Sequence, residues 1–427
     1  MKSQTHSLET TRVTLKREKL ISASLLPRIF ALALVVFISP IVVTNLIIAF
    51  FKGNTVLFNT KKQDALGRTV LLHAFSGGFF RKSAWLFDIV NGHLSFTGVP
   101  LTHSLKRADQ YEIRRKYLST PGIFSLFDLH KSSGLAVANE KQLLIQQLNG
   151  SVLQNGGLII KSILCLCLYS RNTKKLNNGA HITLFGLNIT NSTISEAVDW
   201  VALAPRKASP NIGFYVNANS INLGLSKPAF IKQLQQADAL FADGSGMRMA
   251  AKSAGYQLKD NNNGTDMLPH LCCSCVSNQK SIFLLGAKPG VAQQAADNLT
   301  SQYPQLNIAG VQHGYTSPDK ADELIAQIND SHCDILLVAF GSPVQEAWVL
   351  KHRSTLKCQT ILAVGGLFDF YSGEISRSPM WLRELGLEWV WRLMKEPKSK
   401  FYRYVIGNPL FLFRIHVLGL ASKGERL

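Results

Sequence analysis

The second half of the chain alternates short apolar runs with longer segments in which apolar residues recur at helical spacing. The apolar runs predict strands at residues 182–187, 213–217, 239–242, 281–285, 307–312, 335–339 and 360–364. The longer segments predict helices at residues 193–203, 227–236, 246–254, 291–303, 318–329 and 344–357. Strands that alternate with helices are typical of an α/β fold. The pattern therefore predicts a Rossmann-like, mostly parallel sheet with flanking helices.

A long apolar run at residues 29–51 dominates the first part of the chain, and it follows a polar, basic segment at residues 1–28. The run is long enough to cross a bilayer as a helix, which takes about 20 residues, and it is too long for a cleaved signal peptide. Pro40 lies near its middle and should break or kink the helix, because proline lacks a backbone N–H. Basic residues flank both ends, which favours a re-entrant hairpin over the alternative, a kinked spanning helix.

The segment after this run has a mixed pattern, for which we expect an α+β domain. Residues 79–92 predict a helix and residues 94–100 a following turn. A second apolar run, at residues 157–169, is too short to span a bilayer and predicts a buried or interfacial helix. A polar linker at residues 171–179 follows it, and we place a domain boundary there. The expected domains after the apolar run are residues 52–178, 179–376 and 377–427.

The chain is strongly basic, with a formal net charge of +19 and a pI near 9.7. Such a charge predicts an anionic partner, which is nucleic acid, a phospholipid surface or a phosphorylated substrate. The sequence has no zinc-finger spacing and no RNA-binding aromatic signature, and its basic clusters flank apolar runs, as contact with lipid headgroups requires. We therefore favour a membrane and a nucleotide-sugar over nucleic acid. With 46% hydrophobic and 17% charged residues, the composition excludes a disordered chain.

Cysteine and histidine give no sign of a metal site or a hydrolase. The 7 cysteines have no paired spacing, which indicates reduced thiols rather than a disulfide framework. Cys272, Cys273 and Cys275 suggest a metal site, but no second ligand pair follows at the interval that zinc needs, and burial in a helix is the favoured alternative. No H-E-x-x-H pair and no G-x-S-x-G elbow is present. We expect no metal and no cofactor.

Polar residues follow the predicted strands, where ligands bind in parallel α/β sheets. Asp243 follows the strand at 239–242, and as a general base it would take a proton from an acceptor hydroxyl. Asn217 and Asn219 follow the strand at 213–217 and suit sugar hydroxyls or a phosphate. A local role is the alternative for all three, as the N-cap of the next helix or as turn residues.

Further candidates follow a strand or open a helix, namely Gly244, Gly264, Thr265, Asp266, Lys288, Gln345, Glu346, Gly365 and Gly366. Lys288 lies in a strand-to-helix turn and would hold a pyrophosphate together with backbone N–H groups of the helix start. The pair Gly365 and Gly366 would admit a uracil or a ribose, with close backbone packing as the alternative. Glu346 and Asp266 have an alternative role as residues that stabilise a helix N-terminus.

The segment from residue 377 to the end combines tryptophan and tyrosine with many basic residues. Aromatic rings and cations on amphipathic helices suit the headgroup layer of a membrane. Arg392, Lys395 and Arg403 are the candidate lipid-contacting residues. An ordinary packing helix with a solvated basic face is the alternative interpretation.

A set of short motifs, in order along the chain, resembles that of the WecG/TagA/CpsF glycosyltransferases. The motifs are YVNANS at 215–220, ADGSG at 242–246, NGTD at 263–266, LGAKPG at 285–290, FGSPVQE at 340–346, GGLFD at 365–369 and GLEWVWRL at 386–393. The chain departs from the family at Tyr215, where many relatives have threonine, and at Asn261, near which some have arginine.

The resemblance implies an inverting transfer from a UDP-linked N-acetylhexosamine, or a related sugar, to a polyprenyl-diphosphate-linked sugar acceptor. Asp243 would be the general base. Asn217, Thr265, Asp266 and Gln345 would line the pocket, and Arg392 with Arg403 would meet the lipid diphosphate. Such an enzyme would work at the cytoplasmic face of a bacterial inner membrane, in exopolysaccharide or cell-surface polysaccharide synthesis. Self-association into a homo-oligomer stays open.

The part before residue 178 is similar to bacterial sugar transferases that move a phosphosugar onto polyprenyl phosphate. Pro40 in the apolar run, the NGHLS segment at 91–95 and the TGVP segment at 97–100 carry this likeness. The Asp-Glu pair expected after Arg81-Lys82-Ser83 is missing. Because a covalent phosphosugar intermediate needs that carboxylate, we expect a catalytically inactive anchor domain.

Two other functions remain to be distinguished. The first is a non-catalytic membrane scaffold for polysaccharide assembly, in which both domains have lost their activity. The presence of Asp243 argues against this function. A bifunctional enzyme would need another carboxylate, such as Asp88, in place of the missing pair. It would release UMP, whereas the favoured transfer releases UDP.

Overall fold

The computed structural model describes residues 25, 27–51, 57–75, 81–102, 104–117, 119–135, 139–169, 176–315 and 320–422. Most of the basic segment at residues 1–28 and most of the linker at 171–179 lie outside these ranges. The chain divides into two compact units, residues 1–132 with 137–168, and residues 133–136 with 169–427. Each unit has its own core.

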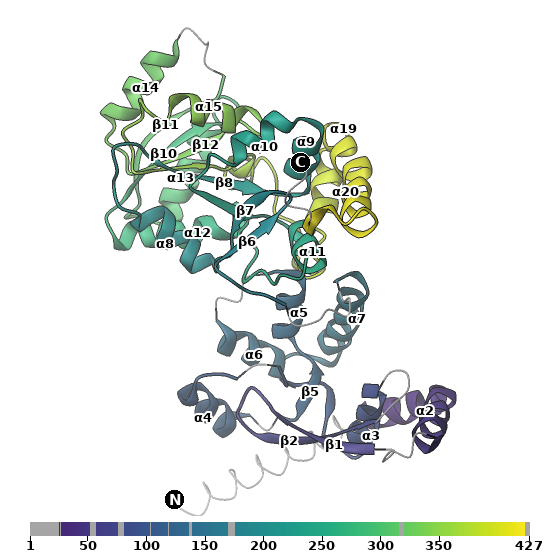
Figure 1. The fold of residues 1–427 in the computed structure, drawn as a ribbon. Helices are drawn as coiled ribbons and strands as arrows, with labels where there is room; N and C mark the ends of the chain where they lie inside the picture. Colours follow the sequence, from purple (N-terminus) through teal and green to yellow (C-terminus); the bar gives the residue numbers. More distant parts are fainter. Residues whose placement is uncertain are drawn as a thin grey trace, which may run out of the picture. The chain divides into compact units, whose positions relative to one another are not determined.

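The second unit is built on one 8-stranded sheet with the order β11-β10-β12-β13-β8-β9-β7-β6 (Figure 1). All neighbouring strands run parallel except β6 and β7. The prediction of a mostly parallel sheet with helices is confirmed. The strands are β6 His181–Leu184, β7 Leu187–Thr190, β8 Asn211–Val216, β9 Ala239–Ala242, β10 Ser281–Gly286, β11 Asn307–Gln312, β12 Ile335–Ala339 and β13 Thr360–Ala363.

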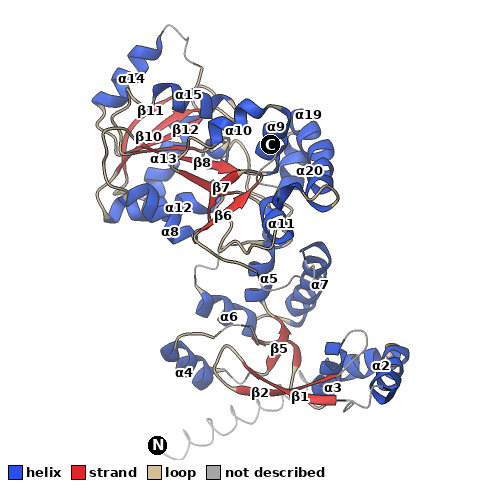
Figure 2. Ribbon diagram, viewed as in Figure 1, coloured by secondary structure: helices blue, strands red, loops and turns tan. Residues whose placement is uncertain are grey.

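Helices cover both faces of this sheet (Figure 2). The central strands β8, β9, β10, β12 and β13 are buried along their whole length, as the near-continuous apolar runs of parallel strands require. In β8, Phe214 and Val216 pack into the core of one face and Tyr215 into the core of the other. The helices up to β13 are α8 Ile194–Leu203, α9 Ala218–Ser226, α10 Pro228–Leu234, α11 Ser245–Ser253, α12 Gly264–Ser277, α13 Val291–Gln302, α14 Ala321–Asp330 and α15 Val344–His352.

A chain of short helices follows β13 in the second unit. Phe411 and Ile415 of α20 pack into one of the two sheet cores, which fixes this segment to the sheet. Met394, Phe401 and Tyr402 are instead exposed. The helices are α16 Leu367–Tyr371, α17 Met380–Glu384, α18 Glu388–Lys395, α19 Pro397–Phe401, a π-helix at Tyr402–Ile406, α20 Gly407–His416 and a 3₁₀ turn at Leu420–Ser422.

The first unit combines small sheets with helices. The unit has a hairpin of β1 and β2 and a 3-stranded sheet with the order β3-β5-β4, and Leu72 of β2 and Phe96 of β3 belong to the same core. Its strands are β1 Leu57–Gln63, β2 Thr69–Phe75, β3 Ser95–Thr97, β4 Val99–Pro100 and β5 Pro121–Phe124. Its helices are α2 Ser39–Phe51, a 3₁₀ turn at Arg81–Ala84, α3 Trp85–Val90, α4 Arg107–Lys116, α5 Leu126–Ser133, α6 Glu140–Leu148 and α7 Val152–Tyr169.

The first apolar run forms two helical segments, Pro27–Phe37 and Val42–Ile48, which are bent by 63°. The break near Pro40 is therefore confirmed, and the choice between a re-entrant and a spanning course stays open. The second apolar run is longer than expected, because α7 has 18 residues. By length and composition α7 could cross a membrane, so the prediction that this run is too short is wrong.

The structure corrects several predicted elements. The expected strand at 182–187 is a hairpin of β6 and β7, because Phe185 and Gly186 both have positive φ, 52° and 72°, and turn the chain. The helix α9 was not predicted, and the helix expected at 344–357 ends at His352. The turn expected at 94–100 contains β3 and β4, since its backbone pairs with β5.

Candidate active site

The strand order brings the carboxyl ends of β12, β13, β8 and β9 side by side. In β8 and β9, Val216 pairs with Ala242 as the last residue of each strand. Asn217 and Asp243 come next, so the backbone register alone places them as neighbours. Gly341 and Gly365 follow the ends of β12 and β13 at the same edge.

Asn217 makes two sets of contacts with the two ends of its side-chain amide. Its Oδ1 accepts from the backbone N–H groups of Asn219 and Ser220, at 3.1 Å each, and so caps α9. Its Nδ2 donates to Oδ2 of Asp243 at 3.3 Å. The local cap interpretation is therefore correct for the oxygen, while the nitrogen holds the carboxylate of the neighbouring strand.

Asp243 is half-buried and does not cap the helix that follows it. The N-cap position of α11 belongs to Gly244, and no side chain caps this helix. Burial raises the pKa of the Asp243 carboxyl above its ordinary value; Asn217 and Arg403 oppose this and Asp266 adds to it. Gly244 has φ of 89° and open space where a side chain would begin. The carboxylate thus lies beside an open glycine turn, with one oxygen fixed by Asn217.

Asp266 opens α12 and is held by several partners. Asn263 caps the helix by accepting from the backbone N–H of Asp266 at 2.8 Å, and its Nδ2 donates to the Asp266 carboxylate at 2.7 Å. Arg377 and Arg383 both pair with this carboxylate, the latter at 3.2 Å. Burial would raise the pKa of Asp266, but Arg377, Asn263 and Arg383 outweigh it and lower the pKa below its ordinary value.

Gln345 and Glu346 lie beneath the glycine turns. They are 3% and 0% exposed. Oε1 of Gln345 accepts from the backbone N–H of Gly341 at 3.2 Å and of Gly365 at 3.0 Å. Both glycines have open space at the side-chain position, whereas at Gly366 a side chain would meet Asp369 at 3.0 Å and Arg392 at 3.4 Å. Direct contact of Gln345 or Glu346 with a substrate stays a prediction.

The remaining predicted residues lie around this edge or on the terminal helices. Lys288 is exposed in the turn between β10 and α13, and Asn219, Gly264 and Thr265 are half-buried. The backbone oxygen of Thr265 accepts from the Tyr371 hydroxyl at 2.9 Å. Lys395 is exposed on α18, with its ammonium 4.9 Å from the centre of the Trp391 ring.

Four arginines after β13 carry a buried N–H group that has no hydrogen-bond partner within the described ranges: Nε of Arg377, Nε of Arg383, Nη1 of Arg392 and Nε of Arg403. Arg392 lies over the Phe370 ring at 4.7 Å and pairs with Glu396 at 3.0 Å. Arg403 is close enough to Asp243 to favour its charged form. A buried guanidinium with a free donor is suited to an anion, because an unmade hydrogen bond there is costly.

A metal is not suggested by the part of the chain that the structure describes, where no group of three or more His, Cys, Asp or Glu side chains could hold one. Cys272 and Cys275 of α12 are buried and pack into the sheet core, while Cys273 is exposed. Burial raises the pKa of the Cys275 thiol to about 12. Cys272 and Cys275 are therefore packing residues of α12.

In the first unit, Asp88 is not free to act as a nucleophile. It is 0% exposed, and its carboxylate accepts from the backbone N–H of His73 at 3.0 Å and lies 2.6 Å from Nδ1 of the same residue. Asp88, the candidate carboxylate for a bifunctional enzyme, is therefore buried and occupied.

Several residues that hold the site together were not among the predicted site residues. Asn261 accepts from the backbone N–H of Gly244 at 2.6 Å, and Asn263 caps α12. Arg377 and Arg383 reach Asp266 from more than a hundred residues further along the chain. Only the Asn263 cap had a local signal, an asparagine just before a helix.

The second unit also matches a known protein family. Residues 182–424 match the model described as the glycosyl transferase WecG/TagA/CpsF family. The chain is also similar to N-acetylglucosaminyldiphosphoundecaprenol N-acetyl-beta-D-mannosaminyltransferases of Staphylococcus aureus, from strains MRSA252 and NCTC 8325. Each is 27% identical over 246 residues, which are 56% of this chain and 93% of the relative.

The ion pairs of Asp266 predict a pH-dependent contribution to stability. Because the pKa of Asp266 is lower in the folded than in the unfolded chain, the carboxylate stabilises the fold at neutral pH, and this stabilisation is lost as the pH falls below about 4 and through the lowered pKa. We expect Asp266→Asn to lower the free energy of unfolding by about 1.5–3 kcal/mol at pH 7. Urea unfolding from pH 7 to pH 3 measures the difference, which should narrow below pH 4.

Lys259→Gln serves as the control for an exposed ion pair, since Lys259 meets Glu196 at 2.8 Å on the surface. Its effect should stay below about 1 kcal/mol. If the free energy of unfolding of Asp266→Asn differs from that of the wild type by the same amount at pH 7 and at pH 3, the ion pairs do not stabilise the fold.

Proposed function

The chain belongs to the WecG/TagA/CpsF family of glycosyltransferases, and from this premise we propose its reaction. It transfers a sugar, an N-acetylhexosamine or a related one, from a UDP-sugar to a polyprenyl-diphosphate-linked sugar, with inversion at the anomeric carbon. The names of the relatives, which describe transfer of N-acetylmannosamine to a diphosphoundecaprenol-linked sugar, support this acceptor class. The product would feed exopolysaccharide or cell-surface polysaccharide synthesis.

The contact between Asp243 and Asn217 carries the proposal. In the transfer, the acceptor hydroxyl attacks the anomeric carbon as the bond to UDP breaks, and Asp243 takes the hydroxyl proton. Attack from the side opposite to UDP inverts the configuration. The donated bond from Asn217 at 3.3 Å leaves the other carboxylate oxygen for the acceptor. A pKa raised by burial makes this carboxylate a stronger base than an exposed aspartate.

The two diphosphates need cations, and the site offers arginines. Arg392 and Arg403 each hold a buried N–H without a partner among the described residues, and a phosphate oxygen would satisfy both. We assign these residues to the lipid diphosphate. Gly365, Gly366 and Lys288 border the donor side, and Asn219, Gly244, Gly264 and Thr265 border the sugar.

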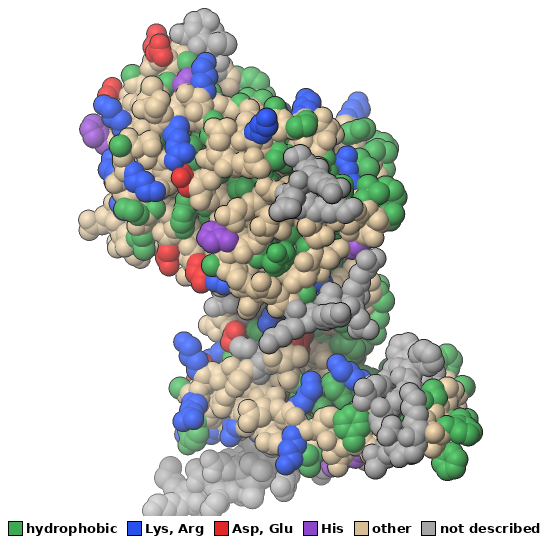
Figure 3. All heavy atoms as spheres, viewed as in Figure 1, with side chains coloured by type: hydrophobic (Ala, Val, Ile, Leu, Met, Phe, Trp, Pro, Cys, Tyr) green, Lys and Arg blue, Asp and Glu red, His purple; other side chains and the backbone are tan. Residues whose placement is uncertain are grey.

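A membrane surface is the proposed location of this chemistry. Hydrophobic side chains gather over α19 and α20 (Figure 3), among them Phe401, Tyr402 and Phe413. Lys395, Lys398 and Lys400 lie in the same segment. Apolar rings beside cations favour the headgroup layer. With the bent helices of the first unit, we propose the cytoplasmic face of a bacterial inner membrane.

The first unit is proposed as an anchor related to polyprenyl phosphosugar transferases that has lost its activity. The missing Asp-Glu pair and the buried state of Asp88 support this role. The unit would hold the transferase at the membrane where its lipid acceptor resides.

Asp243→Asn tests the catalytic base. The amide keeps the size of the side chain but takes no proton, so we expect kcat to fall by about a hundredfold to ten-thousandfold with little change in KM. The measurement is UDP release by detergent-purified protein with a panel of UDP-sugars and a polyprenyl-diphosphate-linked sugar.

Asp297→Asn, on the exposed face of α13, is the matched control and should keep the wild-type rate. Full transfer by Asp243→Asn would favour a different base. No UDP release by the wild type with any donor would instead favour the non-catalytic scaffold.

The nucleotide released separates the proposed transfer from the bifunctional alternative. With polyprenyl phosphate and a UDP-sugar, the wild type should release no UMP, because Asp88 is buried against His73. Chromatography of the nucleotides after the reaction measures this. Release of UMP at a rate comparable to that of UDP would show that the first unit is an active phosphosugar transferase.

A further inference from the structure

Glu346 is a fully buried carboxyl at the start of α15, at 0% exposure. Its Oε1 accepts from Oγ of Ser342 at 2.6 Å and from Nε2 of Gln345 at 3.0 Å. Its Oε2 has no hydrogen-bond partner in the described part of the chain. Burial raises the pKa of Glu346 above its ordinary value, and the hydrogen bonds from Ser342 and Gln345 oppose this. A buried acid with this arrangement offers one fixed acceptor to Gln345.

Gln345 connects two turns of the proposed donor side. Its Oε1 accepts from the backbone N–H groups of Gly341 and Gly365, which follow the adjacent strands β12 and β13. One amide oxygen thus ties the carboxyl ends of two neighbouring strands. Both N–H groups are used in this way, and the turns face open space, since a side chain at either glycine would meet nothing within 4 Å.

The orientation of the Gln345 amide depends on Glu346. If the amide were rotated by half a turn, its Nε2 would face two N–H groups and its Oε1 would face an acceptor, and neither end would be satisfied. The acceptors Glu346 and Ser342, the latter at 3.4 Å from Nε2, select the observed orientation. Removing the acceptor at Glu346 would free the amide to rotate and the turns to separate.

We propose that Glu346 is a positioning residue for the transfer, which orients Gln345 and thereby sets the separation of the Gly341 and Gly365 turns that border the UDP-sugar. This inference rests on the proposed function, because that function assigns the donor to the Gly365 turn, and Gln345 ties the Gly341 turn to it. In this proposal Glu346 does not contact the substrate, but acts on donor binding through Gln345.

Two substitutions at Glu346 distinguish the effect of the hydrogen-bond acceptor from the effect of side-chain volume. Glu346→Gln keeps a carbonyl-type acceptor for Ser342 and Gln345, and Glu346→Leu removes it at similar size. We expect Glu346→Leu to raise KM for the UDP-sugar at least tenfold, with less than a twofold change in KM for the lipid acceptor. Glu346→Gln should restore KM for the donor to within threefold of the wild type.

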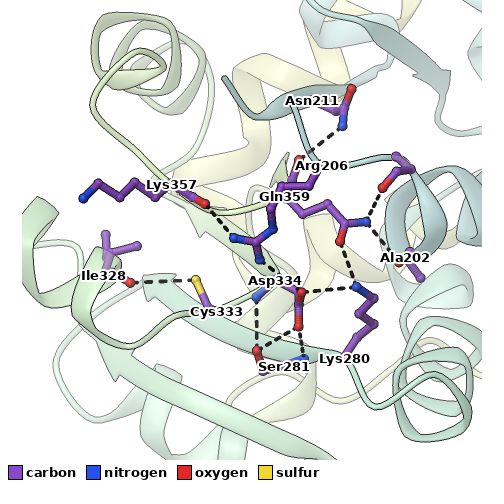
Figure 4. Close-up of polar contacts among 11 residues, drawn as sticks. Ala202, Arg206, Asn211, Lys280, Ser281, Ile328, Cys333, Asp334, Lys357 and Gln359 are labelled. Atoms are coloured by element: carbon purple, nitrogen blue, oxygen red, sulfur yellow. Dashed lines mark hydrogen bonds and ion pairs between the residues drawn. The ribbon is translucent and has the colours of Figure 1, made fainter. Parts of the chain in front are cut away.

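Gln359→Leu is the control for a lost buried hydrogen bond. Gln359 is 3% exposed and precedes β13, at the amino end of the same strand pair. There it donates to the backbone oxygen of Ala202 at 3.2 Å and accepts from Lys280 at 2.9 Å (Figure 4). Gln359→Leu should lower the melting temperature as much as Glu346→Leu and leave both KM values unchanged.

Amide hydrogen exchange tests, without any substrate, whether Glu346 holds the Gly341 and Gly365 turns through Gln345. In Glu346→Leu the N–H groups of Gly341 and Gly365 should exchange faster than in the wild type, and in Gln359→Leu they should not. Unchanged exchange, an unchanged KM for the donor, or a Glu346→Gln variant as impaired as Glu346→Leu would overturn the proposal. If the wild type transfers no sugar at all, the proposed function fails, and the exchange rates alone decide whether Glu346 holds the turns.

Discussion

The hydrogen bond between Asn217 and Asp243 joins the ends of two adjacent parallel strands, and the proposed chemistry depends on it. β8 and β9 end in register at Val216 and Ala242, so the next residue of each strand emerges at the same edge. The cap that Asn217 provides for α9 fixes its amide, and the amide fixes the carboxylate. The cap of α9, the register of β8 and β9 and the position of the candidate base therefore depend on one another.

Several arginines around this edge pair with carboxylates, and Arg377, Arg383, Arg392 and Arg403 all keep a buried N–H group without a hydrogen-bond partner among the described residues. Asp266 is matched by Arg377 and Arg383, which secures the segment after α16 to the start of α12. Arg392 and Arg403 keep unmatched N–H groups near Asp243 and the Gly365 turn. An arrangement that leaves buried cations short of acceptors is suited to a ligand that brings its own negative charge, and a diphosphate does so.

Much of the fold followed from the sequence because parallel strands buried on both faces are short and almost wholly apolar. The buried strands 239–242 and 335–339 coincide with the predicted ranges. The hairpin of β6 and β7 was missed because its turn rests on a positive φ at Phe185, which no pattern of apolar residues reveals. Asp243 and Asn217 could be named as candidates because polar residues after buried strands are conspicuous, and the structure places them as neighbours. The arginines that pair with Asp266 were missed because their contacts are distant in the chain, and the burial of Gln345 and Glu346 was missed because a helix start is usually exposed.

Rescue of a truncated side chain by a small acid tests the role of Asp243 most directly. Asp243→Ala leaves space for formate beside Asn217, and the rate of sugar transfer in single turnovers is measured as formate is added at constant ionic strength. We expect a slow variant whose rate of sugar transfer rises with formate and not with chloride. A variant that transfers sugar at the wild-type rate without formate would contradict it.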